Sequence, residues 1–210
     1  MGGLLILGCG ETEEVNETSI VISDKAMEAQ SVTVDMIRFT DTATTMPLPE
    51  VDVMQLRFMT LGHLYVDLQT FHRPGSKLIL VVMKGFQGGL SPYCITQAAQ
   101  LIANYSKFTD RDTEIVIAFP VETDQESSRL EELQLGAAAQ LRSPQILAPM
   151  PMVLDVGLES VKKLGIEKNL ASPATYIFDS TGTLKFAYVG KHVGDRPSVQ
   201  AMLDEVDRLP

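Results

Sequence analysis

The chain has 210 residues, of which 45% are hydrophobic and 21% charged, and its formal net charge is −10. This length suits one globular domain with a tail, and the composition is that of a soluble domain with a real core. The acidic balance, with no cluster of Lys or Arg, argues against nucleic acid as a partner. Three widely spaced histidines and two cysteines form no metal pattern, and no phosphate-loop or dinucleotide motif is present. We therefore expect neither a metal nor another cofactor.

Residues 1–30 combine a short apolar run with a polar, acidic stretch that we interpret as an anchor and a solvated linker. The sequence Ile-Leu-Gly-Cys that ends at Cys9 resembles the cleavage box of bacterial lipoproteins, in which the cysteine carries the lipid. No Lys or Arg precedes the apolar run, which is also short; a start site assigned too far downstream explains both. The resemblance implies lipid attachment at Cys9 and a membrane-tethered, extracytoplasmic place in the bacterial cell envelope. The alternative is an apolar N-terminal remnant.

The next segments predict an N-terminal strand and a hairpin before the central sheet. Residues 31–50 are expected to hold a first strand, over 31–39, and then a loop rich in Thr and Pro. Residues 51–71 alternate over short pieces and predict a hairpin, and a turn at 73–76 leads from it into the first central strand. The unbroken apolar run at 78–83 predicts a central strand that is buried on both faces.

A cysteine follows this strand at the start of a predicted helix. Ser91 is a good N-cap, Pro92 suits the first helical position, and apolar residues recur at helical spacing as far as residue 108. Cys94 falls in the first turn, where free backbone N–H groups and the helix dipole stabilise a thiolate. This arrangement favours a redox thiol. The alternative is that Cys94 is a small, inert core residue.

The second half of the chain alternates strands and helices and then ends in a hairpin and a helix. The order predicts an α/β domain over residues 51–210, with a central mixed sheet and helices on both faces. The expected elements are a strand over 113–119 that ends at Pro120, a helix over 127–141, a loop over 143–151, a strand over 152–155, a helix over 157–164, a hairpin from 174–179 and 184–189, and a helix over 197–209.

Two motifs resemble the thioredoxin fold and, more narrowly, the alkyl hydroperoxide reductase/thiol-specific antioxidant (AhpC/TSA) family of peroxiredoxin-like redoxins. The first is the buried strand, its glycine-bearing loop and the Ser-Pro-Tyr-Cys sequence at residues 91–94. The second is Pro-Ala-Thr-Tyr-Ile-Phe-Asp at 173–179, followed by Gly182, which is similar to a family hairpin. The resemblance implies a thioredoxin-like fold in which Pro173 is cis and lies beside Cys94.

Each cysteine motif of these families is half present. Thioredoxins carry Cys-x-x-Cys, but Ser91 takes the first position here, so a two-thiol cycle within the motif is impossible. Peroxiredoxins carry Pro-x-x-x-Thr/Ser-x-x-Cys; Ser91 and Cys94 match this pattern, whereas Gln87 replaces the proline. The peroxiredoxin arginine that lies across the site would fall at or near Pro173, where no arginine stands.

The first functional hypothesis is a one-cysteine thiol peroxidase, in the class of thiol peroxidases and thiol–disulfide oxidoreductases. Cys94 attacks a peroxide, becomes a sulfenic acid and is reduced by an external thiol, either a small molecule or a thioredoxin-like protein. Ser91 hydrogen-bonds the thiolate or the peroxide oxygen, and Pro173 completes the catalytic group. The expected supporting residues are Pro92, Tyr93, Lys84 and Thr175.

A second hypothesis belongs to another class: a non-catalytic thioredoxin-fold module, tethered to a membrane and used for binding or assembly. Ser91, Gln87 and the missing arginine motivate it. A third possibility keeps Cys94 as a mixed-disulfide or isomerase-like partner of other thiol proteins, without peroxide chemistry.

Overall fold

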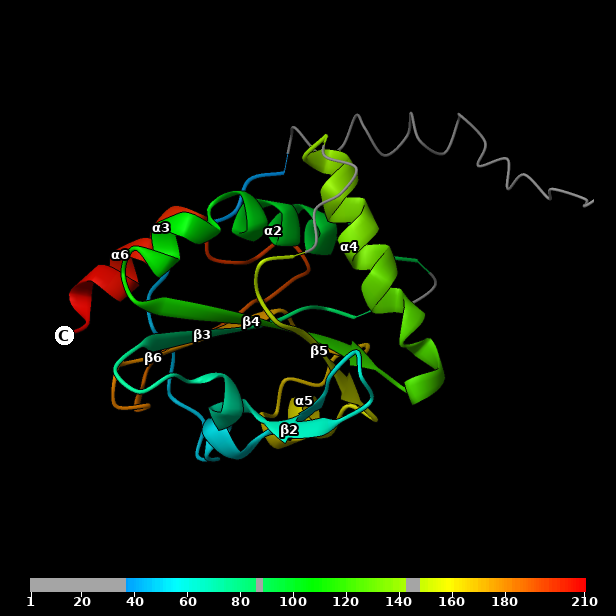
Figure 1. Ribbon diagram of the computed structural model, residues 1–210, viewed down its shortest axis with the longest axis horizontal. Helices are drawn as coiled ribbons and strands as arrows, with labels where there is room; N and C mark the ends of the chain where they lie inside the picture. Colours follow the sequence, from blue (N-terminus) through cyan, green and yellow to red (C-terminus); the bar gives the residue numbers. More distant parts are fainter. Residues whose placement is uncertain (1–36, 86–88, 143–147) are drawn as a thin grey trace, which may run out of the picture.

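The computed structural model describes residues 37–85, 89–142 and 148–210 (Figure 1). Seven strands form one mixed sheet in the order β2-β1-β5-β4-β3-β6-β7. Its centre is parallel, and antiparallel pairs complete both edges. The strands are β1 (Arg57–Met59), β2 (Tyr65–Asp67), β3 (Lys77–Val82), β4 (Thr113–Val121), β5 (Met152–Val156), β6 (Ala174–Phe178) and β7 (Leu184–Val189).

Helices cover both faces of this sheet, as predicted (Figure 1). One face carries α2 (Pro92–Ala103), α3 (Tyr105–Thr109), α4 (Ser128–Gln140) and α6 (Val199–Arg208). The other face carries α5 (Glu159–Lys163), with the short turns η1 (Val53–Gln55) and η2 (Leu68–Phe71), while η3 (Asp124–Glu126) precedes α4. None of the helices in the described segments is long and apolar enough to cross a membrane.

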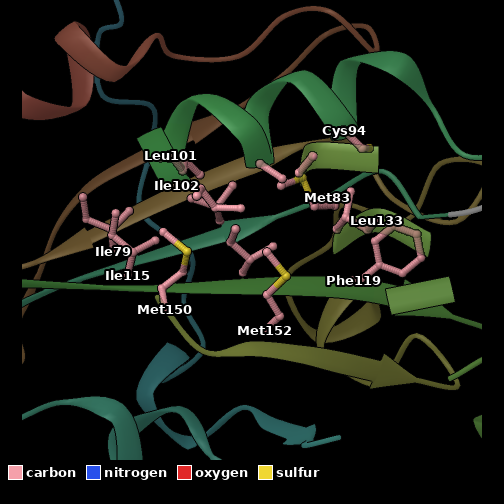
Figure 2. Close-up of a cluster of buried hydrophobic side chains, with 14 of the residues drawn as sticks. Ile79, Met83, Cys94, Leu101, Ile102, Ile115, Phe119, Leu133, Met150 and Met152 are labelled. Carbon is pink, nitrogen blue, oxygen red and sulfur yellow. The ribbon is translucent and has the colours of Figure 1, made fainter. Parts of the chain in front are cut away.

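Two buried clusters lie on the two faces of the sheet and explain its continuous apolar strands. The cluster under α2, α4 and α6 includes Ile79 and Cys94, and Figure 2 shows its side chains from the helix and the strands meeting in one layer. The cluster on the opposite face includes the alternate residues Leu78 and Leu80 of the same strand. Because successive side chains of a strand point to opposite faces, β3 needs apolar residues throughout its buried part, from Leu78 to Val82.

The helix that carries the cysteine begins where the sequence predicts and ends earlier. Ser91 is the N-cap with an extended backbone and Pro92 is the first helical residue, but the Ser91 side chain makes no capping bond. At Asn104 the backbone leaves the helical conformation, and the Asn104 side-chain amide donates to the Gln100 carbonyl at 2.8 Å. This local bond competes with helix continuation, so the residues to 109 form a separate helix, α3.

The prediction that the second central strand ends at Pro120 is wrong, since β4 continues to Val121. Pro120 has no N–H to donate, which usually excludes proline from a central strand. However, the ladder between β3 and β4 ends at the pair Val82 and Ala118, and Pro120 pairs only with Asp155 of β5. The missing donor therefore lies beyond the end of β3, where no ladder bond is lost.

The segment before residue 50 joins the domain differently from the prediction. The described part of the expected first strand, residues 37–39, is not a strand, and Thr40 forms an isolated bridge with Pro197. The Thr40 N–H donates to the Arg196 carbonyl at 2.9 Å, and the Ser198 N–H donates to the Thr40 carbonyl at 2.8 Å. These bonds fix the backbone on both sides of Pro197, just before α6.

The proline expected to be cis is trans. No peptide bond in the described segments is cis, and this includes the bond between Ser172 and Pro173. The expectation from the family resemblance is therefore wrong at this position. The Gly190 N–H donates to the Pro173 carbonyl at 2.8 Å, which ties the start of β6 to the end of β7.

The turn between β6 and β7 is organised by Asp179, which is only 5% exposed. Its carboxylate accepts hydrogen bonds from the Thr181 N–H at 2.9 Å and the Thr183 N–H at 3.0 Å, and it lies 3.2 Å from the Lys185 ammonium. Burial alone would raise the pKa of Asp179, but the bonds from Thr181, Thr183 and Lys185 outweigh it and lower the pKa to about 2.

We expect Asp179→Ala to lower the free energy of unfolding by about 1–3 kcal/mol at neutral pH, because the Thr181 and Thr183 N–H groups that fix the turn lose their charged acceptor. The folded pKa lies below the unfolded value of about 3.9, so this stabilisation is complete above that value and disappears as the pH falls towards 2. Urea unfolding between pH 7 and pH 2.5 measures the difference between variant and wild type, with Glu50→Ala, an exposed acid, as the control. A difference that does not shrink with falling pH would contradict the prediction.

Candidate functional site

The loops that follow β3 and β7 leave the sheet at the same edge. Val82 at the end of β3 and Val189 at the end of β7 both lie opposite Ala174, the first residue of β6. The segment after β3 leads to Cys94 at the start of α2, and the segment after β7 is the loop of residues 190–196. The topology therefore brings these two parts of the chain together.

Cys94 is fully buried in the first turn of α2. Figure 2 shows its side chain directed into the cluster between the helix and the sheet, near Met83. Its sulfur has one polar partner that the sequence did not reveal: the Arg196 Nη2 donates to the Cys94 Sγ at 3.3 Å. The two residues are 102 positions apart in the chain.

The Arg196 guanidinium is itself almost entirely buried, with 1% of the residue exposed. Its Nη1 donates to the Gln97 Oε1 at 2.6 Å, and its Nε donates to the Val193 carbonyl at 2.9 Å. In the part of the chain that the structure describes, no carboxylate pairs with this guanidinium. A buried cation without an anionic partner is costly, so its hydrogen bonds to the Gln97 and Val193 oxygens and to the Cys94 sulfur are what hold it in place.

The carboxylate of Asp195 holds the loop that presents Arg196. It accepts hydrogen bonds from the Tyr188 hydroxyl and from the Lys191 N–H, and the Asp195 N–H donates to the His192 carbonyl. Burial and the bond to Asp195 raise the pKa of Tyr188 to about 12. Burial would raise the pKa of Asp195, but its bonds from Tyr188 and Lys191 lower it below the usual value. At neutral pH the Asp195 carboxylate that holds the loop is therefore charged.

Two glycines let this loop pack closely. A Cβ on Gly190 would lie 2.1 Å from the Asp195 carbonyl oxygen, and a Cβ on Gly194 would lie 2.7 Å from the Cε1 atom of Tyr93. Tyr93, predicted as a supporting residue, therefore packs against the loop of residues 190–196 rather than against the Cys94 sulfur. Pro92 lies exposed at the first position of α2 and sets the start of the helix.

Ser91 and Thr175 carry buried side-chain hydroxyls, and neither has a hydrogen-bond partner. The hydroxyl of Ser91 thus makes no bond to the sulfur, which differs from the expected bond to the thiolate. Thr175 lies opposite Val81, whose side chain belongs to the same cluster as Cys94, so it faces the helix α2 side of the sheet. Buried hydroxyls without partners are unusual and mark places where a polar ligand gains hydrogen bonds.

Lys84 lies within electrostatic reach of the thiol, as its place after β3 suggests. Burial lowers the pKa of Lys84, and the proximity of Cys94 acts in the opposite direction. Its ammonium is held by the Lys168 carbonyl at 3.1 Å and the Asn169 carbonyl at 2.6 Å. Lys84 and Pro173 line the same small cavity, of about 90 Å³.

Two expectations fall on residues outside the described segments, namely Gln87 at the peroxiredoxin proline position and Cys9 at the lipoprotein box. Among the described residues, no group of three or more His, Cys, Asp or Glu side chains could hold a metal ion.

The sequence of residues 61–187 matches the profile of the AhpC/TSA family. The chain belongs to this family. No functionally curated protein matches the chain in sequence.

Solved structures confirm the thioredoxin-like fold of this AhpC/TSA protein. A cysteine-to-serine mutant of peroxiredoxin 6 from Arenicola marina has a TM-score of 0.62 at 14% identity, over 79% of this chain and 73% of that one. A yeast mitochondrial 1-Cys peroxiredoxin has a TM-score of 0.58 at 11% identity, over 77% and 76%. Peroxiredoxin Q from Xanthomonas campestris has a TM-score of 0.53 at 14% identity, over 78% and 97%.

Sequence reasoning missed Arg196, because it looked for the family arginine only near Pro173. One signal could have located it. In a hairpin beside β3, the second strand runs parallel to β3, so the loop after β7 must emerge where the loop after β3 does. A cation in that loop, just before the C-terminal helix, is thereby placed at the edge that carries Cys94.

We expect Asp195→Ala to lower the free energy of unfolding by about 1–3 kcal/mol, because the Tyr188 hydroxyl and the Lys191 N–H lose their acceptor. The loosened loop should also speed the alkylation of Cys94 by iodoacetamide several-fold. Urea unfolding and mass spectrometry of the Cys94 peptide measure the two effects, and Asp204→Ala on the exposed side of α6 is the control. Equal behaviour of the two variants would show that Asp195 does not hold the loop.

Proposed function

We propose that this AhpC/TSA protein is a one-cysteine thiol peroxidase, in which Cys94 reduces peroxides and an external thiol regenerates it. One observation carries the proposal: the buried Arg196 guanidinium donates to the Cys94 Sγ at 3.3 Å and has no carboxylate partner among the described residues. A structural cysteine in an apolar core needs no such neighbour.

The site offers the sulfur a hydrogen-bond donor and a positive charge, which supports the proposed role of Cys94 as a nucleophile. A guanidinium in a water-excluded place gains most from a partner with a full negative charge, and the thiolate of Cys94 is the group within reach. The position of Cys94 in the first turn of a helix of twelve residues adds the favourable end of the helix dipole. Because the thiolate is the nucleophile, both effects support reaction with an electrophilic oxygen.

The reaction then follows from the groups around the sulfur. The thiolate attacks the terminal oxygen of a hydroperoxide, an S–O bond forms, and the O–O bond breaks as its electron pair leaves on the alkoxide or hydroxide, which takes up a proton. Cys94 is oxidised to a sulfenic acid while the peroxide is reduced to an alcohol or water. Arg196 and the unpartnered hydroxyls of Ser91 and Thr175 are the donors that can hold the peroxide oxygens.

A thiol must restore the enzyme from outside the described domain, where Cys94 is the one free cysteine. An external thiol attacks the sulfenic sulfur, a disulfide bond forms and the oxygen leaves as water. A second thiol then releases Cys94 as a thiol and leaves with the first as a disulfide. The reductant class is therefore a small thiol or a thiol protein.

Access to the sulfur requires local opening, because Cys94 has no exposed surface. The two parts that enclose it are the first turn of α2 and the loop of residues 190–196, which are joined through the Arg196 contact. Local openings of this size take place well below the free energy of global unfolding. The proposal therefore includes movement of this loop or of the helix start before the peroxide enters.

The test uses the full chain with Cys9→Ser, so that Cys94 is the remaining thiol. Hydrogen peroxide is added with a dimedone-type trap, and the modified peptide is identified by mass spectrometry while peroxide consumption is followed with dithiothreitol as reductant. We expect a sulfenic-acid adduct at Cys94. In Cys94→Ser, the rate of peroxide consumption should fall at least about 100-fold. No adduct, together with unchanged consumption in Cys94→Ser, would overturn the proposal.

We expect Arg196→Met to slow the oxidation of Cys94 by about 10- to 100-fold, because the donor and the positive charge at the sulfur are lost. Arg196→Lys should recover part of the rate, since it keeps the charge but not the planar set of donors. Stopped-flow oxidation by hydrogen peroxide measures the rates, and Arg111→Met at an exposed ion pair is the control. Wild-type rates in both Arg196 variants would remove the arginine from the mechanism.

A second candidate function is a non-catalytic thioredoxin-fold module for binding or assembly, and the complete burial of Cys94 favours it. It predicts that Cys94 resists both hydrogen peroxide and iodoacetamide until the protein unfolds. The trapping experiment above therefore separates the two functions.

We also propose that the protein is held at a bacterial membrane through lipid on Cys9, which places it in the cell envelope. The Ile-Leu-Gly-Cys sequence at residues 6–9 supports this. Mass spectrometry of the protein from the membrane fraction should find a diacylglyceryl group on Cys9, and Cys9→Ser should release the protein. Membrane association that persists in Cys9→Ser would contradict the anchor.

A further inference from the structure

A small basic cavity lies beside Pro173, at the edge of the sheet where the thiol and the arginine meet. It has a volume of about 90 Å³. We call it the cationic pocket, because every ionisable side chain among its described lining residues is basic: Lys84, Lys168, Lys191 and His192. The rest of its wall comes from Asn169, Ala171, Ser172, Pro173, Gly190 and Val193.

This concentration of positive charge runs against the composition of the chain, which has 27 acidic residues and 17 Lys and Arg. A protein of net charge −10 repels small anions on average, so an anionic ligand needs a local cluster of cations to bind. Within the described segments, none of the three pocket lysines forms an ion pair. Their charges therefore remain available to a ligand.

Bonds to backbone carbonyls hold two of the pocket lysines, Lys84 and Lys168, in place without neutralising them. Lys84 donates to the carbonyls of Lys168 and Asn169, which leaves the third N–H of its ammonium uncommitted. Lys168 donates to the Lys191 carbonyl at 3.3 Å, across the pocket from one wall to the other. The Asp195 carboxylate, which lies within electrostatic reach of His192 and Lys191, accepts from the Tyr188 hydroxyl and the Lys191 N–H through its two oxygens.

The pocket connects to the thiol through one residue. Val193 lines the pocket, and its carbonyl accepts the bond from the Arg196 Nε at 2.9 Å. The same guanidinium donates to the Cys94 Sγ through its Nη2. The loop of residues 190–196 therefore contributes both to the pocket wall and to the contact on the sulfur, and Lys84 of the pocket lies within electrostatic reach of Cys94.

We propose that the cationic pocket binds the carboxylate of a small acidic thiol, and that this thiol is the reductant of the oxidised Cys94. The second half of this inference, the role of the thiol as reductant, rests on the proposed function. A cavity of about 90 Å³ accommodates a group the size of a carboxylate, and the free hydroxyl of Ser172 and the amide of Asn169 add neutral polar contacts. A thiol held in this way attacks the sulfenic sulfur of Cys94, an S–S bond forms between the two sulfurs, and the oxygen leaves as water.

Binding is tested first, with a probe that cannot react. The probe is 3-(methylthio)propionate, compared with its uncharged methyl ester, in ¹H–¹⁵N NMR titrations of the reduced protein. We expect saturable shifts of the amides around residues 168–173 and 190–193 with the acid and none with the ester. Lys84→Gln/Lys168→Gln/Lys191→Gln should weaken binding at least about tenfold, since three nearby charges are removed.

The matched control removes the same charge from exposed lysines elsewhere, in Lys107→Gln/Lys162→Gln/Lys163→Gln, and should bind as the wild type does. Because Lys84 is half-buried, Lys168→Gln/Lys191→Gln is tested as well and should weaken binding without affecting the fold. The pocket would be overturned by equal shifts with acid and ester, by shifts elsewhere in the protein, or by the absence of a saturable shift. An equal loss of binding in the control variant would overturn it as well.

Reduction is tested second, with the rate at which Cys94 sulfenic acid reacts with 3-mercaptopropionate and with 2-mercaptoethanol. The ratio of the rate with 3-mercaptopropionate to the rate with 2-mercaptoethanol should fall several-fold in the triple pocket variant and stay constant in the control variant. Comparing this ratio between variants cancels the intrinsic reactivity of each thiol. An unchanged ratio with intact binding would overturn the role as reductant. If the acid binds but no sulfenic acid forms at all, the peroxidase proposal fails while the carboxylate site stands.

Discussion

The contact between a buried guanidinium and a buried sulfur is the constraint around which this end of the molecule is arranged. Arg196 is almost without exposed surface, so its charge must be met inside the protein. It is met by the Cys94 sulfur and by neutral oxygens of Gln97 and Val193. The proposed chemistry of Cys94 rests on this contact, which also joins the start of α2 to the loop before α6.

The fold supports this contact from several directions. The order of the sheet brings the ends of β3 and β7 to one edge, and the Asp195 carboxylate closes the loop between β7 and α6. Thr40 binds the backbone of Arg196 from the N-terminal segment. The lysines beside Pro173 form a second, outer layer of positive charge. Arg196 thus contacts the sulfur, and the three lysines line a separate cavity at the same edge of the sheet.

The sequence predicts most of the framework because hydrophobic burial determines it. Continuous apolar runs identified β3 and β4, and Ser91 with Pro92 marked the start of α2. The errors have local causes. Pro120 continues β4 because β3 has already ended, and Pro173 is trans although the family resemblance implied otherwise. Arg196 was missed because it meets Cys94 only through tertiary structure. No spacing rule links residues 102 positions apart, and only the strand order does.

The position of Arg196 also bears on where the domain can be cut. The family match ends at residue 187, before the arginine loop and before all of α6. A recombinant piece trimmed to that match would keep Cys94 and discard the guanidinium that donates to its sulfur, together with Met202, Leu203 and Val206 of the core. The boundary of recognisable family similarity and the boundary of the chemical unit are therefore different. The smallest piece that keeps the sulfur in its native environment has to extend through the C-terminal helix.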